Sequence, residues 1–368
     1  MSSILKKLKG KGTAIPIQQA PAVPSGSTAS SLAPTARPLV SNPQAPIVVV
    51  LIHGLNSSES AFIGANGTSW ATELNQLLEP LINKTVEVVE VGWQTTPLSP
   101  ANVSLNISST APELLDAVAS QVRGRDWVAV GHSMGGMEIL AAMGIAFAEV
   151  SGQAANPRTA VTQRSQQWGT LLDSCLGIFR LASPGQGSPW GQPGVILAGL
   201  IPHATGAQIR GLQIDSTESR AITDSSDQWF RYRLTKNKPV NVFSAQETEP
   251  VVPGTPKIVD YDGSAFSVSS TRLTNSKTVL LPGESHTSAP KAQPGTHTAD
   301  ILVAGVAFCI DGKVPPGIEL TPGRDKPSGL AGKVSRILPL ASTLKRRLPG
   351  GSGGRGAGGS GGGAAPTS

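Results

Sequence analysis

The sequence predicts an α/β fold with a doubly wound, mainly parallel sheet, and two kinds of pattern support this prediction. Continuous β-branched runs, such as residues 46–52, are typical of parallel strands buried on both faces. These runs alternate with helical patterns, as between Trp70 and Ile82, where apolar residues recur on one face. Alternating strands and helices form a parallel sheet that helices cover on both sides.

The other expected elements follow in chain order. A capping box at 110–113, with proline near the first helical position, predicts the start of a second helix. Mixed helical pieces at 195–201 and 208–234 interrupt the alternation and predict an inserted helical cap over about residues 188–238. Further strands are expected at 86–91, 127–130, 177–183, 240–244 and 278–281, and further helices at 134–150 and 298–310.

The two ends of the chain differ from the middle in composition. Residues 1–45 are rich in Pro, Ala, Ser and Thr, and residues 313–368 turn to Pro and Gly, so both are expected to be disordered tails. Residues 46–312 then form one domain, which suits a chain of 368 residues better than two domains would.

The net positive charge of the chain comes from these ends. Residues 1–45 hold five basic residues and no acid, and residues 324–368 hold eight basic residues and one acid. Of the net charge of +6, the ends therefore carry +12 and the middle carries −6. Weak contact of the basic ends with a membrane surface is one interpretation, since Ile4, Leu5 and Leu8 interleave with lysines, but such a segment more often serves only as a solubilising tail. Nucleic acid is not expected, because the arginines near 345–355 have no aromatic residues beside them to stack on bases.

Cysteine usage and the N-terminus indicate the compartment. Cys175 and Cys309 do not make a disulfide framework, and Cys309 reads as a buried thiol in the last helix. Neither a signal peptide of standard form nor a run of transmembrane length is expected. The default is a cytoplasmic protein, with unconventional export left open, and the sequence leaves the oligomeric state undetermined.

The segment Gly131-His-Ser-Met-Gly135 joins an apolar strand to a helical run. The turn requires strained backbone angles at Ser133, and side chains at 131 and 135 would collide with the neighbouring strand and helix. The Ser133 hydroxyl is thereby raised above the sheet, with the Met134 N–H pointing at the same space. The same glycine–serine pattern around Ser352 and Ser360 has no strand before it and no helix after it.

A serine nucleophile needs a base, and the chain has five histidines. His53 follows the first strand, His132 lies inside the turn with its side chain expected to point away from the reaction space, and His203 lies in the cap. His297 opens the last helix and is expected at the surface or on the cap. His286 follows the last strand, where the carboxyl ends of parallel strands meet. It is the expected base.

The acid should follow the preceding strand and precede the histidine in the chain. Glu247 and Glu249 both meet this condition, and Asp260 and Asp262 lie later in the same connection. Spacing favours Glu247 only slightly. The oxyanion would receive hydrogen bonds from Met134 N–H and from Leu55 N–H, where Gly54 lets the backbone approach closely.

Several segments resemble those of a known family. Residues 50–55, 131–136 and 181–188 look like the oxyanion, nucleophile and following motifs of α/β-hydrolase lipases. Residues 247–250, 259–265 and 284–291 resemble the C-terminal motifs of serine-active-site-containing, lipase-like proteins. The resemblance implies an α/β-hydrolase fold and favours Glu247 as the acid, with Ser133 as nucleophile and His286 as base.

These observations predict a serine hydrolase that cleaves carboxylic esters, with small-molecule or lipid substrates. The apolar run at 195–201 favours lipid-like acyl esters, although the same residues could serve only to pack the cap on the core. No metal and no organic cofactor are expected. The alternatives are an acyltransferase or thioesterase with the same machinery, and a catalytically silent fold used for binding.

Overall fold

The computed structural model describes residues 34–54, 61–92, 107–155, 162–184, 217–250 and 268–323. Its strands form one sheet in the order β1-β3-β2-β4-β5-β6-β7. Strands β2 to β7 are parallel to their neighbours, and only the edge strand β1 is antiparallel, to β3. The prediction of a mainly parallel sheet is therefore confirmed. The strands are β1 (Thr35–Val40), β2 (Ile47–Ile52), β3 (Val86–Gly92), β4 (Asp126–His132), β5 (Cys175–Leu181), β6 (Asn241–Glu247) and β7 (Asn275–Leu281).

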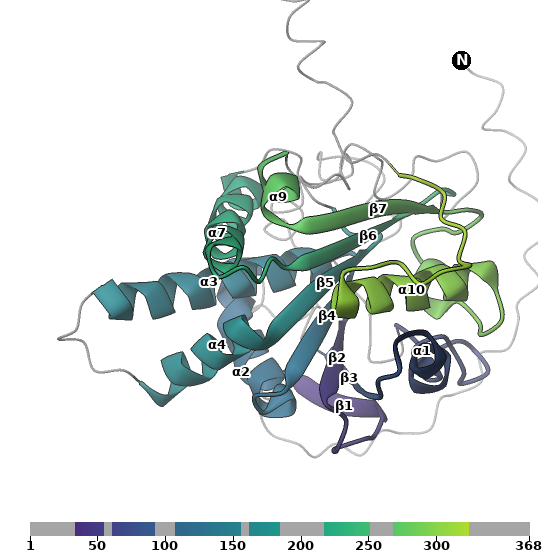
Figure 1. Cartoon of the computed structure of the whole chain (residues 1–368), viewed down its shortest axis with the longest axis horizontal. Helices are drawn as coiled ribbons and strands as arrows, with labels where there is room; N and C mark the ends of the chain where they lie inside the picture. Colours follow the sequence, from purple (N-terminus) through teal and green to yellow (C-terminus); the bar gives the residue numbers. More distant parts are fainter. Residues whose placement is uncertain are drawn as a thin grey trace, which may run out of the picture. The chain divides into compact units, whose positions relative to one another are not determined.

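Helices cover both faces of this sheet (Figure 1). Val48, Val50 and Ile52 of β2 pack with α2, α3, α4 and α7 on one face, and the alternate residues of β2 pack with α1 and α10 on the other. This alternation is what a strand buried on both sides requires, because successive side chains point to opposite faces. The helices are α1 (Leu74–Ile82), α2 (Ile107–Val122), α3 (Met134–Ala155), α4 (Gln163–Ser174), α7 (Thr217–Thr235), α9 (Val268–Leu273) and α10 (His297–Asp311), with a 3-10 turn η3 (Ala289–Lys291).

The direction of winding reverses between β2 and β4. From β2 the chain proceeds to β3 on one side, whereas from β4 it proceeds through β5, β6 and β7 on the other. In open α/β sheets, ligands bind beyond the carboxyl ends of the strands at such a reversal. His53 and Gly54 follow β2, and Ser133 follows β4, so the topology places the serine turn at this position.

Part of the expected N-terminal tail is ordered, so the prediction of disorder over residues 1–45 is wrong for β1. This strand pairs with β3, and Arg37 forms an ion pair with the buried Glu90 at 2.7 Å. Its residues are mostly half-buried or exposed, so it lacks the apolar run by which the central strands were recognised.

The expected C-terminal tail also begins too early at residue 313. Leu280 N–H donates to Thr321 O at 2.8 Å, and Gly323 N–H donates to Thr278 O at 3.0 Å. Residues 321–323 therefore cover the outer edge of β7, where unpaired backbone groups would otherwise be exposed.

The expected cap over residues 188–238 needs a similar correction. Helix α7 lies within that range, but it packs on α3 as the helix before β6, with Trp229 and Phe230 buried. Gly144 of α3 permits this contact, because a Cβ there would lie 2.3 Å from Ser225 Oγ. The remainder of the expected cap, residues 185–216, lies outside the described residues.

Two further helices depart from expectation. Helix α2 begins at Ile107, so the capping box at 110–113 is wrong and Pro112 lies inside the helix. Within the described residues, Met134–Gly152 of α3 is long and apolar enough to span a membrane by length and composition, although 67% of that window is buried. The expectation that no segment approaches this length is thus corrected, and the burial is that of a core helix in this fold.

Candidate active site

Ser133 lies in a left-handed turn between β4 and α3, with φ of 55°. Glycines on either side make the turn possible. A Cβ at Gly131 would lie 2.4 Å from Gly136 Cα, and a Cβ at Gly135 would lie 2.4 Å from the carbonyl oxygen of Ile52. The predicted collisions with helix and strand are confirmed, and the strained serine angle is the one that a nucleophile elbow requires.

The turn after β2 touches the serine directly. A Cβ at Gly54 would lie 2.5 Å from Ser133 Cβ and 3.0 Å from Ser133 Oγ. The buried His53 stabilises this turn, because its Nδ1–H donates to the carbonyl oxygen of Gly54 at 2.9 Å. The close backbone approach expected at Gly54 is therefore present.

Of the two expected oxyanion donors, only Met134 lies within the described residues. Met134 is the first residue of α3, so its N–H belongs to the positive end of that helix, next to Ser133. Leu55 lies outside the described residues, and its donor role stays a prediction.

His286 lies between the serine and a carboxylate. Its Nε2 is 2.8 Å from Ser133 Oγ, and its Nδ1 is 2.7 Å from Glu247 Oε2. An ionised carboxylate only accepts, so Nδ1 carries the proton and the lone pair of Nε2 faces the serine hydroxyl. Glu247 is 1% exposed and His286 7% exposed, so solvent competes little with these bonds. The arrangement can remove a proton from Ser133 Oγ.

The alternative acids lie elsewhere. Glu247 ends β6, whereas Glu249 is exposed and its backbone N–H donates to Glu284 O at 2.9 Å. Asp260 and Asp262 lie outside the described residues. Of the two glutamates, the structure therefore brings Glu247 to His286.

Hydrogen bonds from Thr248 join the loop after β6 to the loop that carries His286. Thr248 Oγ1 donates to Leu281 O at 2.9 Å and accepts from Gly283 N–H at 2.8 Å. Thr248 N–H also donates to Glu284 O at 3.0 Å. The carboxylate of Glu284 in turn accepts from Ser288 Oγ and from Thr298 Oγ1, the latter at the start of α10. The two loops therefore form one hydrogen-bonded unit, a feature the sequence analysis did not identify.

His132 contacts His286, which the sequence analysis did not expect. Its ring lies against that of His286, with centroids 4.9 Å apart, and its Nε2 lies 2.9 Å from the carbonyl oxygen of His286. Burial is the main reason that the pKa of His132 falls to about 3, and the charge of His286 lowers it further. Nothing in the local sequence indicates this contact, since the two residues are 154 positions apart.

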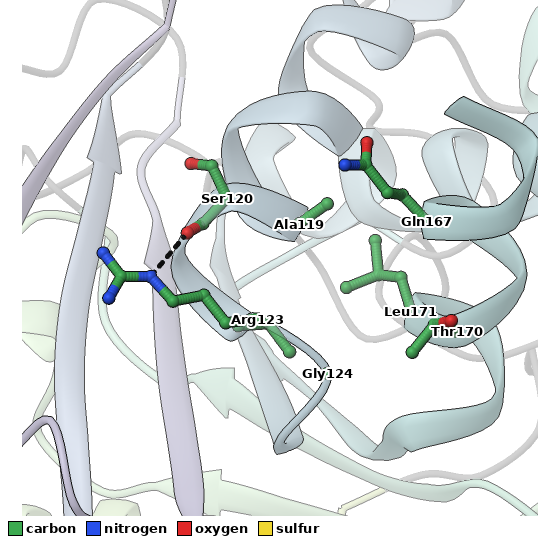
Figure 2. A pocket seen from close by; sticks show the side chains of 8 residues that line it. Ala119, Ser120, Arg123, Gly124, Gln167, Thr170 and Leu171 are labelled. Atoms are coloured by element: carbon green, nitrogen blue, oxygen red, sulfur yellow. Dashed lines mark hydrogen bonds between the residues drawn. The ribbon is translucent and has the colours of Figure 1, made fainter. Parts of the chain in front are cut away.

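Within the described residues, neither His297 nor the cavity between α2 and α4 forms part of this site. His297 is exposed at the first turn of α10, and His203 lies outside the described residues. A cavity of about 330 Å³ lies between the C-terminal end of α2 and α4 (Figure 2). Arg123 and Gly124 line it just before β4 begins, whereas Ser133 follows the end of that strand. No cluster of three or more potential metal ligands occurs among the residues that the structure describes.

This chain has the α/β-hydrolase fold, as its parallel sheet and strand–serine–helix turn define it. No protein-family model and no curated protein matches the sequence. Solved structures similar to this chain include a Bacillus licheniformis lipase, BlEst2 in mature form, at 15% identity and a TM-score of 0.40. That match covers 62% of this chain and 76% of the lipase.

Two further solved structures are similar at the same low level of identity. The phospholipase PlaB from Legionella pneumophila, in complex with thio-NAD, has 16% identity and a TM-score of 0.47. The match covers 72% of this chain but only 59% of the phospholipase. Est1E from Butyrivibrio proteoclasticus has 13% identity and a TM-score of 0.38, with 76% of this chain and 94% of Est1E covered. These similarities concern the fold; the narrower resemblance to serine-active-site-containing proteins stays a prediction.

Proposed function

We propose that this protein is a serine hydrolase that cleaves carboxylic esters through an acyl-enzyme. Ser133 is the nucleophile, His286 the general base and Glu247 the acid that fixes the imidazole. The observation that supports this proposal is the continuous series of hydrogen bonds from Glu247 through His286 to Ser133, at 2.7 and 2.8 Å. A serine that only packs in a turn would not need an imidazole oriented by a carboxylate.

The proposed reaction has two steps. His286 Nε2 takes the Ser133 proton while Oγ attacks the ester carbonyl, and the carbonyl electron pair moves to the oxygen. Met134 N–H and Leu55 N–H stabilise that oxyanion. The tetrahedral intermediate collapses, and the alcohol leaves with the proton from His286. Water, deprotonated by the same histidine, then attacks the acyl-enzyme, and the acid leaves as Ser133 regains its proton. This route uses no metal and no organic cofactor.

Lipid-like acyl esters are the favoured substrates within this class. The support is the apolar run at residues 195–201, which would suit an acyl chain. The basic ends would add weak attraction to an anionic membrane surface, which increasing salt would screen. Acyl transfer to another alcohol, or thioester hydrolysis, would use the same residues.

The test is hydrolysis of p-nitrophenyl esters of graded chain length. Wild-type protein should turn over at least one ester, and Ser133→Ala should reduce kcat by about four orders of magnitude or more. Ser352→Ala is a matched control, because Ser352 lies in the same glycine–serine pattern but the sequence around it predicts neither a strand nor a helix. Product analysis with added alcohol or thiol acceptors distinguishes an acyltransferase from a hydrolase. No turnover of any ester or thioester would favour a silent fold used for binding.

A further inference from the structure

His132 contacts the backbone of His286, the residue assigned as the base. Glu247 contacts the side chain of the same residue. A carbonyl oxygen can only accept, so the 2.9 Å contact requires that His132 Nε2 carries a proton and donates to His286 O. The His132 ring also flanks the His286 imidazole, at a centroid distance of 4.9 Å and an interplanar angle of 43°. His286 is thus fixed at its Nδ1 by one residue and at its backbone by another.

The position of His132 in the chain connects this contact directly to the nucleophile. His132 is the last residue of β4 and directly precedes Ser133. Ser133 N–H donates to Leu181 O at 3.0 Å, so this strand end is itself attached to β5. The same short, rigid segment therefore carries the nucleophile and holds the backbone of the base. A misplacement of about 1 Å between reacting groups can cost about a hundredfold in rate.

The other ring nitrogen shows what the imidazole contributes. Nδ1 of His132 is buried and has no hydrogen-bond partner within the described part of the chain. Burying an unsatisfied acceptor is unfavourable, and an apolar side chain of similar size would avoid that cost. The benefit of an imidazole at this position is then the Nε2–H donor that faces His286.

We propose that His132 is a positioning residue for the proposed ester hydrolysis: its Nε2–H and its ring hold His286 opposite Ser133. The inference rests on the proposed function for its catalytic meaning, and on the hydrogen bond and ring contact for its geometry.

The neutral state of His132 is part of this role. His286 becomes positively charged when it takes the serine proton, and a second cation 4.9 Å away would oppose that charge. Burial lowers the pKa of His132 to about 3, and the charges of His286, His53 and Lys291 act in the same direction. The backbone carbonyl of His286 is the contact that raises this pKa. At neutral pH His132 therefore donates a hydrogen bond without adding charge.

A matched pair of amides tests the proposal. The side-chain nitrogen of Gln reaches about as far as Nε2 of histidine, whereas that of Asn is one methylene shorter. We expect His132→Gln to keep kcat within about threefold of wild type, and His132→Asn to lower it about tenfold with KM little changed. His297→Asn, at an exposed histidine, should leave both constants unchanged. Equal kcat values for the Gln and Asn variants would overturn the proposal.

Two further measurements keep the result interpretable. Thermal unfolding identifies a variant that fails to fold; if the Asn variant fails, His132→Leu replaces it and should show the same tenfold loss. Proton NMR of the low-field His286 Nδ1–H signal requires no turnover. We expect it to persist in wild type and His132→Gln and to broaden through solvent exchange in His132→Asn. If the three proteins show these signals but the wild type hydrolyses no ester, the proposed function fails while the positioning contact stands. An unchanged signal in all variants would overturn the positioning role itself.

Discussion

The turn around Ser133 and the loops that carry Glu247 and His286 are held in place by different kinds of contact. In the turn, neighbouring atoms approach so closely that no Cβ fits at Gly54, Gly131 or Gly135. In the loops, the Thr248 side chain joins the loop after β6 to the loop after β7, and the Glu284 carboxylate joins the latter loop to α10. The turn should therefore tolerate no added atom, whereas the loops should tolerate changes that keep the donors and acceptors.

The largest difference in kcat is expected between substitutions of two neighbouring glutamates. Glu247→Gln should lower kcat by about two to four orders of magnitude, because the imidazole loses the carboxylate that fixes its tautomer. Glu249→Gln, at an exposed side chain two residues away, should cost less than about tenfold. Steady-state kinetics on one soluble ester compares them. The reverse ranking would move the acid to Glu249, and small effects from both would direct attention to Asp260 or Asp262.

The second largest loss of kcat is expected when one methyl group is added to the turn. Gly54→Ala would bring a Cβ to within 2.5 Å of Ser133 Cβ, so the serine or the loop must shift. We expect a loss of about a hundredfold in kcat, the cost of misplacing a reacting group by about 1 Å. Gly152→Ala in α3 is the control, since a Cβ there meets nothing within 4 Å. If circular dichroism shows both proteins folded and both are fully active, the close approach at Gly54 has no catalytic importance.

A smaller effect is expected from the link between the acid and base loops. Thr248→Val removes the hydroxyl that bonds Leu281 O and Gly283 N–H but keeps the shape of the side chain. We expect kcat to fall about tenfold, and Thr248→Ser to restore most of it, because serine keeps the hydroxyl. The ratio of kcat between the Val and Ser variants is the measurement. A ratio near one would show that the loops keep their positions without this bond.

A last effect concerns stability in acid, not the rate of turnover. The pKa of His132 is about 3 in the folded protein, below the ordinary value of 6.5, so the unfolded chain binds the proton more readily. Stability should therefore decrease as pH falls from about 6.5 towards 3. His132→Gln lacks this group and should lose less stability over that range. Denaturant unfolding of both proteins at several pH values gives the difference, and parallel curves would contradict the assigned pKa.

Much of the fold was predictable because it depends on local patterns. The apolar runs of β2 and β4 and the glycines around Ser133 are legible in a single sequence, since each meets a steric or burial requirement of its own segment. The order serine, acid, histidine along the chain, together with the convergence of strand ends, was sufficient to bring His286 and Glu247 into consideration.

What could not be predicted depends on contacts between distant segments. The edge strand β1 is largely half-buried or exposed, and its pairing with β3 leaves no apolar run to recognise. Helix α4 has only four buried residues among twelve, so its pattern is weak. The contact of His132 with His286 depends on how β4 and the loop after β7 meet, and the choice of Glu247 over Glu249 depends on where β6 ends.

Mapping the residue modified by a fluorophosphonate probe tests the central claim, that Ser133 is activated by His286, most directly. Mass spectrometry of the labelled, full-length protein should find the adduct on Ser133, and His286→Ala should abolish labelling while the protein stays folded. These results would follow from an imidazole Nε2 at 2.8 Å from Ser133 Oγ acting as the base. An adduct on another serine, or labelling of Ser133 that persists in His286→Ala, would contradict the claim.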